Sequence, residues 1–167
     1  MKKIGIFYGS TTGTTKSVAQ KIAAGLGVPE ADVHDVAVSA PSDVAAYDVL
    51  LFGASTWNAG DLQEDMDTFL DGVQALDLRG REVALFGCGD ESMSDTFCNS
   101  VGEMYRRLHD MHPEFIGPFY NDGYKYDHSG SDVKGMIVGL CIDEVNHPEA
   151  TDARIKAWCE EIKKEFC

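Results

Sequence analysis

Long apolar runs and a recognisable leader are both missing from this chain of 167 residues. Its basic start, Lys2 and Lys3, leads into only five apolar or small residues before Gly9, which is too few for a signal peptide. No apolar run approaches the roughly 20 residues that a membrane-spanning helix needs. We therefore expect a cytoplasmic protein with no membrane partner.

Paired cysteines and clustered histidines are also missing. The five cysteines are an odd, scattered set without a C-x-x-C pair, so the sequence indicates neither a disulfide framework nor a zinc site. The five histidines are equally dispersed. We expect reduced thiols and no metal centre.

Basic residues are scarce, with 14 Lys and Arg against 28 Asp and Glu and a net charge of −14. This balance makes nucleic acid and anionic membranes improbable ligands and basic proteins plausible partners. An acidic surface that serves only solubility is the simpler alternative. The length and the 44% apolar content suit one domain over residues 1–167 with one substantial core.

Short apolar segments alternate with amphipathic ones along the chain, which is typical of an α/β protein. Five segments read as strands covered on both faces, namely 4–8, 33–38, 49–54, 83–86 and 136–142. Apolar residues recur at helical spacing over 18–26, 62–73, 97–108 and 155–166, and a short helical turn is expected over 42–47 after Pro41.

One region, 109–136, is rich in Gly, Asp and Tyr and breaks this alternation. A structureless loop of that length is uncommon in a compact domain. We expect residues 114–117 to begin the last strand, an inserted loop over 118–135 to interrupt it, and residues 136–142 to complete it.

Candidate ligand residues follow the strands, because an open parallel sheet binds its ligand at the carboxyl ends of its strands. After the first strand come Ser10, Thr11, Thr12, Gly13, Thr14 and Thr15, which lead into a helix. Backbone N–H groups and hydroxyls at a helix N-terminus suit an anion. No Lys follows Gly13 and the G-x-G-x-x-G spacing is absent, so we expect one phosphate monoester. An ordinary polar turn with a capping threonine is the alternative.

Two further loops complete the candidate site. The first holds Ser55, Thr56, Trp57, Asn58, Ala59 and Gly60, and the second holds Cys88, Gly89, Asp90 and Met93, with Thr96 and Cys98 farther on. A Trp at the mouth of a ligand site offers a flat apolar face for stacking on an aromatic ring system. Ordinary packing is the more common role of a single Trp.

The segments FYGSTTGTT, STWNAG and GCGDESMSDTF together resemble the three ligand loops of flavodoxins. The resemblance extends over the whole chain, and the interrupted last strand resembles that of the long-chain subgroup of this family. The resemblance implies a doubly wound parallel sheet of order 2-1-3-4-5 with helices on both faces. It also implies a monomeric carrier of single electrons that is not an enzyme and that holds FMN noncovalently.

By the same resemblance, Ser10 to Thr15 grip the phosphate, Trp57 covers one flavin face, and Cys88 to Asp90 border the pyrimidine edge. Met93 falls where the family usually places a Tyr. On reduction the Asn58–Ala59 peptide turns toward flavin N5, which favours positive φ at Ala59. Six acids make a low reduction potential and a basic redox partner plausible, namely Asp61, Glu64, Asp65, Asp90, Glu91 and Asp95.

Two other functions remain open from the residues. An FMN-dependent NAD(P)H or quinone oxidoreductase could share this fold, although it would need a substrate pocket that few unassigned residues could form. A phosphoacceptor receiver domain would need clustered acids after the first strand and an Asp after the third. This chain has hydroxyls and Trp57 in those places.

Overall fold

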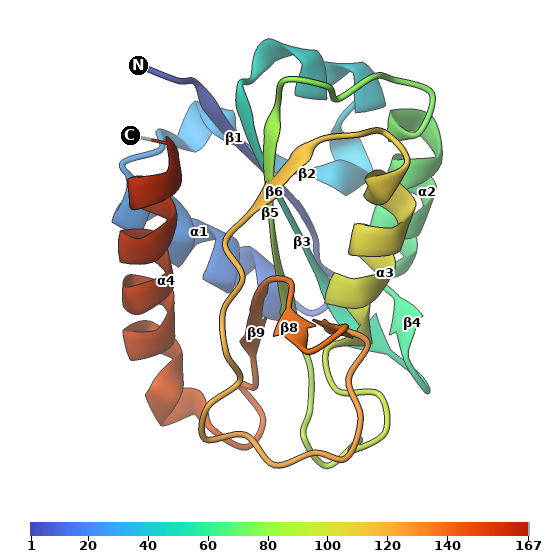
Figure 1. The fold of residues 1–167 in the computed structure, drawn as a ribbon, viewed down its shortest axis with the longest axis vertical. Helices are drawn as coiled ribbons and strands as arrows, with labels where there is room; N and C mark the ends of the chain where they lie inside the picture. Colours follow the sequence, from blue (N-terminus) through green and yellow to red (C-terminus); the bar gives the residue numbers. More distant parts are fainter. Residues whose placement is uncertain (167) are drawn as a thin grey trace.

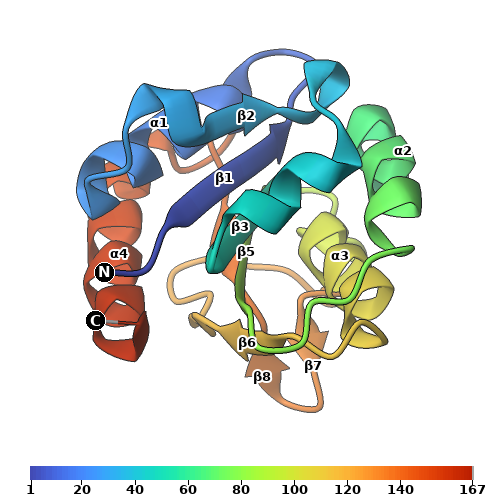
Figure 2. The ribbon, with the colours of Figure 1, turned by 90° about the horizontal axis from the view of Figure 1, so that it is seen from above.

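The computed structural model describes residues 1–166 and shows a twisted parallel sheet between two layers of helices (Figures 1 and 2). Its strands run in the order β2-β1-β3-β5-β6, and β9 also pairs with β5. Their bounds are β1 Ile4–Gly9, β2 Val33–Asp35, β3 Val49–Trp57, β5 Glu82–Cys88, β6 Glu114–Ile116 and β9 Leu140–Ile142. The expected α/β fold and strand order are confirmed when β6 and β9 are counted as two halves of one strand.

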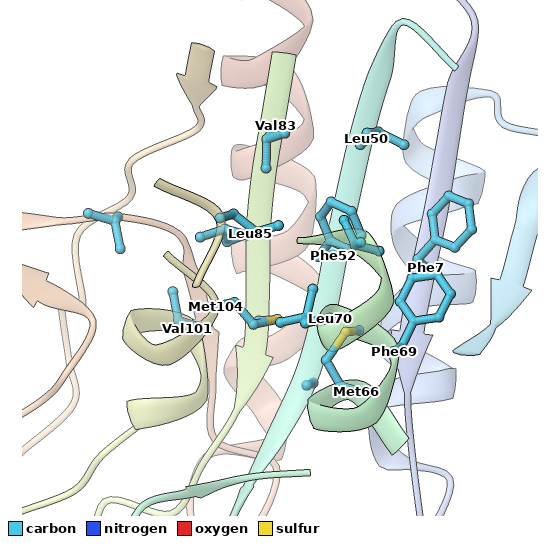
Figure 3. Close-up of a cluster of buried hydrophobic side chains, with 14 of the residues drawn as sticks. Phe7, Leu50, Phe52, Met66, Phe69, Leu70, Val83, Leu85, Val101 and Met104 are labelled. Atoms are coloured by element: carbon cyan, nitrogen blue, oxygen red, sulfur yellow. The ribbon is translucent and has the colours of Figure 1, made fainter. Parts of the chain in front are cut away.

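Helices cover both faces of the sheet (Figure 1). The pair α1 (Thr14–Leu26) and α4 (Thr151–Phe166) packs on one face, while α2 (Glu64–Val73) and α3 (Asn99–His109) pack on the other. Alternate residues of each strand point to opposite faces, so two clusters of buried side chains form. Figure 3 shows the one under α2 and α3, where Phe7, Phe52 and Leu85 of the sheet lie near Leu70 and Met104.

Charges in the sequence fit the ends of α2 and α3. The first turn of α2 holds Glu64, Asp65 and Asp67, where acidic side chains oppose the positive end of the helix dipole. The last turn of α3 holds Arg106, Arg107 and His109 at its negative end. The helices begin at Glu64 and Asn99, and not at 62 and 97 as the apolar spacing suggested. Leu62 lies instead in a two-residue strand, β4 (Asp61–Leu62), antiparallel to β3.

The edge strand is interrupted as expected. β6 pairs with the first half of β5, Glu82 to Ala84, and β9 pairs with its second half, Phe86 to Cys88. The expected limits 136–142 are wrong, because residues Met136–Ile137 form β8, which pairs with β7 (Asp132–Val133) in a separate hairpin. Only residues 140–142 of that segment join the sheet.

The second strand is shorter than expected. It ends at Asp35, whose side chain accepts a hydrogen bond from the Ala37 N–H and starts the 3₁₀ turn η2 (Val36–Val38). Val38 is exposed and does not belong to the sheet. The helical turn expected over 42–47 is present as η3 (Pro41–Ala46), and two other 3₁₀ turns occur, η1 (Glu30–Asp32) and η4 (Pro148–Ala150).

The inserted loop is fixed to the body of the protein. The Arg154 guanidinium of α4 donates hydrogen bonds to the carbonyl oxygens of Tyr120, Asp122 and Cys141 and lies 4.5 Å from the centre of the Tyr124 ring. The lower end of Figure 1 shows this loop beside the loop that follows β5. Among residues 1–166, no helix combines the length and the hydrophobicity that crossing a membrane requires.

Candidate functional site

The loop after β1 presents an open helix N-terminus. Gly13 caps α1 with φ 94° and has no side chain that could accept from the N–H groups of the first turn, and that turn holds no acidic residue. The Gly13 N–H itself donates to the Ser10 hydroxyl oxygen at 3.1 Å. Thr11, Thr12 and Gly13 are exposed, and a Cβ added to Gly13 would meet nothing within 4 Å. The uncompensated N–H groups and the exposed hydroxyls fit an anion such as a phosphate.

Thr15 plays a different part from its neighbours. It is buried, and its hydroxyl lies near the Cys88 thiol at the end of β5. Burial raises the pKa of Cys88 to about 12, so that thiol stays protonated. Thr15 and Cys88 can therefore meet a ligand only through backbone groups.

The other thiols are also withdrawn from solvent. Cys98, Cys141 and Cys159 are buried, and no disulfide joins the four cysteines of residues 1–166. Burial raises the pKa of Cys98 well above its ordinary value. Like Cys88, Cys98 has only its backbone to offer a ligand. Cys167, the fifth cysteine, lies outside the described residues.

Gln63 connects the loop after β1 to α2, and the sequence pattern did not predict this role. Its side chain is buried, accepts a hydrogen bond from the Met66 N–H at 2.9 Å and donates to the Thr11 hydroxyl at 3.1 Å. The same amide donates to Asp65. Gln63 thus caps α2 and orients Thr11 at once. The position of Gln63 just before the acidic first turn of α2 predicts an N-cap residue. No neighbouring residue in the sequence indicates its hydrogen bond to Thr11.

Trp57 ends β3 and begins a tight hairpin to β4. Its indole is 36% exposed, and Nε1 donates to the Ser55 hydroxyl at 2.9 Å. The turn closes with a hydrogen bond from the Gly60 N–H to the Trp57 carbonyl at 3.1 Å. Asn58 has φ 49°, whereas Ala59 is not among the residues with positive φ. In this structure the left-handed position therefore falls on Asn58, a residue type that tolerates it.

The Trp57 hairpin packs against the start of α3. The Thr56 hydroxyl accepts a hydrogen bond from the Ser100 N–H at 3.0 Å. A Cβ at Gly60 would lie 2.7 Å from Nδ2 of Asn99 and 3.2 Å from Cγ2 of Thr96. Thr96, Asn99 and Ser100 therefore support the hairpin from the start of α3. Sequence spacing gives no sign that Asn99 does this.

Gly60→Ala is expected to lower the free energy of unfolding of the apoprotein by about 2 to 3 kcal/mol, since φ 108° is closed to other residues and the new methyl meets Asn99. Gly80→Ala is the matched control. Gly80 also has positive φ, 81°, but has open space around it, so only about 1 kcal/mol of strain is expected there. Urea unfolding measures both, and equal losses would show that the contact with α3 is unimportant.

The loop after β5 is held by hydrogen bonds to the end of β9. The Gly89 N–H donates to the Ile142 carbonyl at 2.9 Å, and Asp90 accepts from Asn146 Nδ2 at 2.8 Å. The Ser92 hydroxyl and the Asn146 amide lower the pKa of Asp90. Met93 follows in this loop and is 48% exposed.

The three loops lie at one end of the sheet, the lower end in Figure 1. A groove of about 640 Å³ joins Thr11 of the first loop to the Trp57 hairpin. Its lining comprises Thr11, Trp57, Asn58, Gly60, Asp61, Leu62, Glu64, Asp67 and Glu103. A second hollow of about 320 Å³ opens beside Thr12, Gly13 and Thr14. The structure thus brings the first two predicted loops together around open space of a size typical for ligand sites.

Comparison with known proteins agrees with this architecture. The family model for flavodoxin matches residues 6–158. The flavodoxin of Haemophilus influenzae is 38% identical and is aligned over 100% of this chain and 97% of its own length. Flavodoxin 1 of Escherichia coli K12 is 40% identical, over 97% of this chain and 93% of its own length.

A solved structure gives the same result. The crystal structure of Fusobacterium nucleatum flavodoxin bound to flavin mononucleotide superposes with a TM-score of 0.91 at 29% identity, and all of both chains is covered. The sequence match and the fold agree. This chain belongs to the flavodoxin family.

Proposed function

We propose that this protein carries single electrons between redox proteins by means of a noncovalently bound FMN. The observation that carries the proposal is the α1 N-terminus, which has no acidic residue in its first turn and is open beside Gly13, at the same end of the sheet as Trp57. An anionic group and an apolar ring can be held there together. The likeness to a flavodoxin bound to flavin mononucleotide supports FMN as that ligand.

The residues divide into three roles. Ser10, Thr11, Thr12, Gly13 and Thr14 hold the phosphate with hydroxyls and amides, and Thr15 adds only its backbone N–H. The Trp57 hairpin, formed by Ser55, Thr56, Trp57, Asn58, Ala59 and Gly60, covers one ring face. The loop after β5 borders the pyrimidine edge through backbone groups of Cys88, Gly89, Asp90 and Cys98, with Met93 and Thr96 toward the other face.

Bound FMN supplies a ring system that accepts and releases electrons one at a time. The chain contributes a hydrogen-bond acceptor, because a turn of the Asn58–Ala59 peptide would let the Asn58 carbonyl oxygen accept a hydrogen bond from an N–H at flavin N5. Asn58 and Ala59 are both exposed at the tip of the hairpin, where few contacts oppose such a turn. Trp57 and Met93 shield the ring from water.

Ala59→Gly is expected to raise the first one-electron reduction potential. The turned peptide requires positive φ at residue 59, which costs Ala on the order of 1 kcal/mol and costs Gly almost nothing. That difference corresponds to roughly 40 mV for one electron. A spectroelectrochemical titration of both proteins measures it, and an unchanged or lower potential in the variant contradicts the assignment of Ala59.

The partner and setting follow from charge and thiol chemistry. Asp61, Glu64 and Asp95 are exposed around the site, which suits a basic redox partner and a low second potential. We further propose a monomeric, single-domain, long-chain flavodoxin, because the inserted loop splits the edge strand between β6 and β9. Unpaired buried thiols suit a cytoplasmic location.

The test of the carrier function is a stepwise anaerobic reduction of the purified protein after reconstitution with FMN. Two separated one-electron steps are expected, with no steady oxidation of NAD(P)H by the protein alone. Addition of a basic flavoprotein reductase should start electron flow that weakens as salt rises. Steady NAD(P)H oxidation without a partner would instead favour an FMN-dependent oxidoreductase.

A further inference from the structure

A buried carboxylate, Asp143, lies directly after β9 and has no solvent exposure. It accepts four hydrogen bonds. Oδ1 accepts from the N–H groups of Val145 at 3.0 Å and Asn146 at 2.9 Å. Oδ2 accepts from the Glu91 N–H at 3.0 Å and from Asn146 Nδ2 at 2.9 Å. Every one of these donors is a neutral amide, and no Lys or Arg side chain is hydrogen-bonded to the carboxylate.

The bond to the Glu91 N–H crosses from the end of β9 to the loop after β5. Residues 89–91 of that loop have two other links to the same region, from the Gly89 N–H to the Ile142 carbonyl and from Asn146 Nδ2 to Asp90. Asn146 is itself held by Asp143 through its backbone and its side chain. Asp143 therefore takes part, directly or through Asn146, in two of the three links.

The inserted loop reinforces this junction. The Asp143 N–H donates to the Tyr124 hydroxyl oxygen at 3.1 Å, and the Lys125 N–H donates to Glu91 Oε2 at 2.8 Å. His147 pairs with Glu91 Oε1 at 2.8 Å. Residues 89–91, 124–125 and 143–147 thus meet at Asp143 and Glu91. Their contacts hold the loop after β5 in place.

A metal site is the competing explanation, because ligand atoms of Glu91, Asp143 and His147 lie within 4.8 Å of one another. However, both Asp143 oxygens already accept two N–H groups each, and Glu91 Oε2 accepts another. A cation would have to displace these donors from a buried carboxylate, which is costly. The contacts fit a residue that orients backbone and not one that binds a metal.

We propose that Asp143 is a positioning residue for the cofactor, holding the backbone of residues 89–91 in place against the pyrimidine edge of FMN through the Glu91 N–H. The inference rests on the proposed FMN site. The pyrimidine edge is common to FMN and riboflavin, and the phosphate is not. Loss of Asp143 should therefore weaken binding of both flavins by the same factor.

The test substitution is Asp143→Asn, which keeps the size of the side chain but replaces one acceptor oxygen by a donor, so that four N–H groups can no longer be accepted. Amide hydrogen exchange of the apoprotein should speed up about tenfold or more at Glu91 while the amides of β1 and β3 keep wild-type rates. The Kd of FMN and the Kd of riboflavin should each rise about tenfold, with their ratio unchanged. Glu149→Gln, which removes an exposed carboxylate that pairs with His147, should behave as wild type.

Wild-type exchange at Glu91 and wild-type Kd values in Asp143→Asn would overturn the proposal. So would equally faster exchange in β1 and β3, which would mark a general loss of stability. If Asp143→Asn does not fold, Asn146→Ala tests the same links from an exposed side chain, and a rise of a few-fold in both Kd values is expected. Failure of the unmodified protein to bind either flavin would refute the FMN site itself, which is a separate result.

Discussion

Gly13→Asp is expected to weaken FMN binding by about 100-fold or more, whereas Gly13→Asn should weaken it by less than about tenfold. Both substitutions place a side chain of the same size where a Cβ meets nothing within 4 Å. Both residue types tolerate positive φ better than most. The pair therefore differs in one respect, a negative charge at the N-terminus of α1.

The expected size comes from Coulomb's law. A carboxylate roughly 5 Å from a phosphate costs about 3 kcal/mol per unit of phosphate charge at an effective dielectric near 20. Even after strong screening by salt, about 3 kcal/mol in total gives roughly 100-fold. Isothermal titration of the two apoproteins measures the effect. Riboflavin, which has no phosphate, is the internal control and should bind both variants equally.

An equal affinity of Gly13→Asp and Gly13→Asn for FMN would contradict the phosphate site. It would mean that the anion lies away from the first turn of α1. A loss shared by FMN and riboflavin would point instead to a distorted loop.

Trp57→Ala is expected to weaken FMN binding by roughly 60-fold. An indole that covers about 100 Å² of the ring contributes about 2.5 kcal/mol at about 25 cal/mol per Å², which corresponds to that factor. Riboflavin should lose affinity by the same factor, because stacking involves the ring and not the phosphate. Fluorescence titration of the apoproteins with each flavin gives both values.

Two control variants separate stacking from hairpin support. Trp57→Phe keeps a flat aromatic face and should lose less than about tenfold in affinity. Ser55→Ala removes the acceptor of the Trp57 Nε1 hydrogen bond and leaves the indole in place, so it should weaken binding of either flavin far less than Trp57→Ala does. If Ser55→Ala is as damaging as Trp57→Ala, the indole acts by supporting the hairpin.

The parts of the fold that the sequence predicts best are those where local pattern and final environment agree. The strand over 4–8 and the helix that follows Gly13 are examples, because unbroken apolar residues mark a covered strand and the Ser, Thr and Gly run marks a helix start. The expected strand 33–38 fails for a local reason. The Asp35 side chain accepts a hydrogen bond from the Ala37 N–H and caps a 3₁₀ turn. The strand therefore ends at Asp35, although the apolar segment continues to Val38.

The support of the site is harder to predict than the site itself. Trp57 and the hydroxyls of the first loop stand out by their residue types. Gln63, Asn99 and Asp143 do not, because each acts through contacts with residues distant in the sequence. Such contacts depend on how the sheet brings separate loops together, and a single sequence records only the order of those loops.

The inserted loop shows the same division. Its composition predicts a break in the last strand, and the structure confirms the break. The short hairpin of β7 and β8 and the anchoring of the loop by Arg154 arise from tertiary contacts. The expected limits of the second half of the strand are therefore too wide at the start and correct at Ile142.

Phosphorus NMR of the FMN complex tests the central claim most directly, namely that uncharged donors at the start of α1 hold the phosphate. The dianion of a free phosphate monoester takes up one proton near pH 6 and becomes a monoanion. Amide and hydroxyl donors together with the helix dipole should keep the bound group dianionic, so its resonance should stay constant from about pH 8 down to about pH 5. A resonance that titrates near pH 6, as in free FMN, would place the phosphate in solvent and contradict the account.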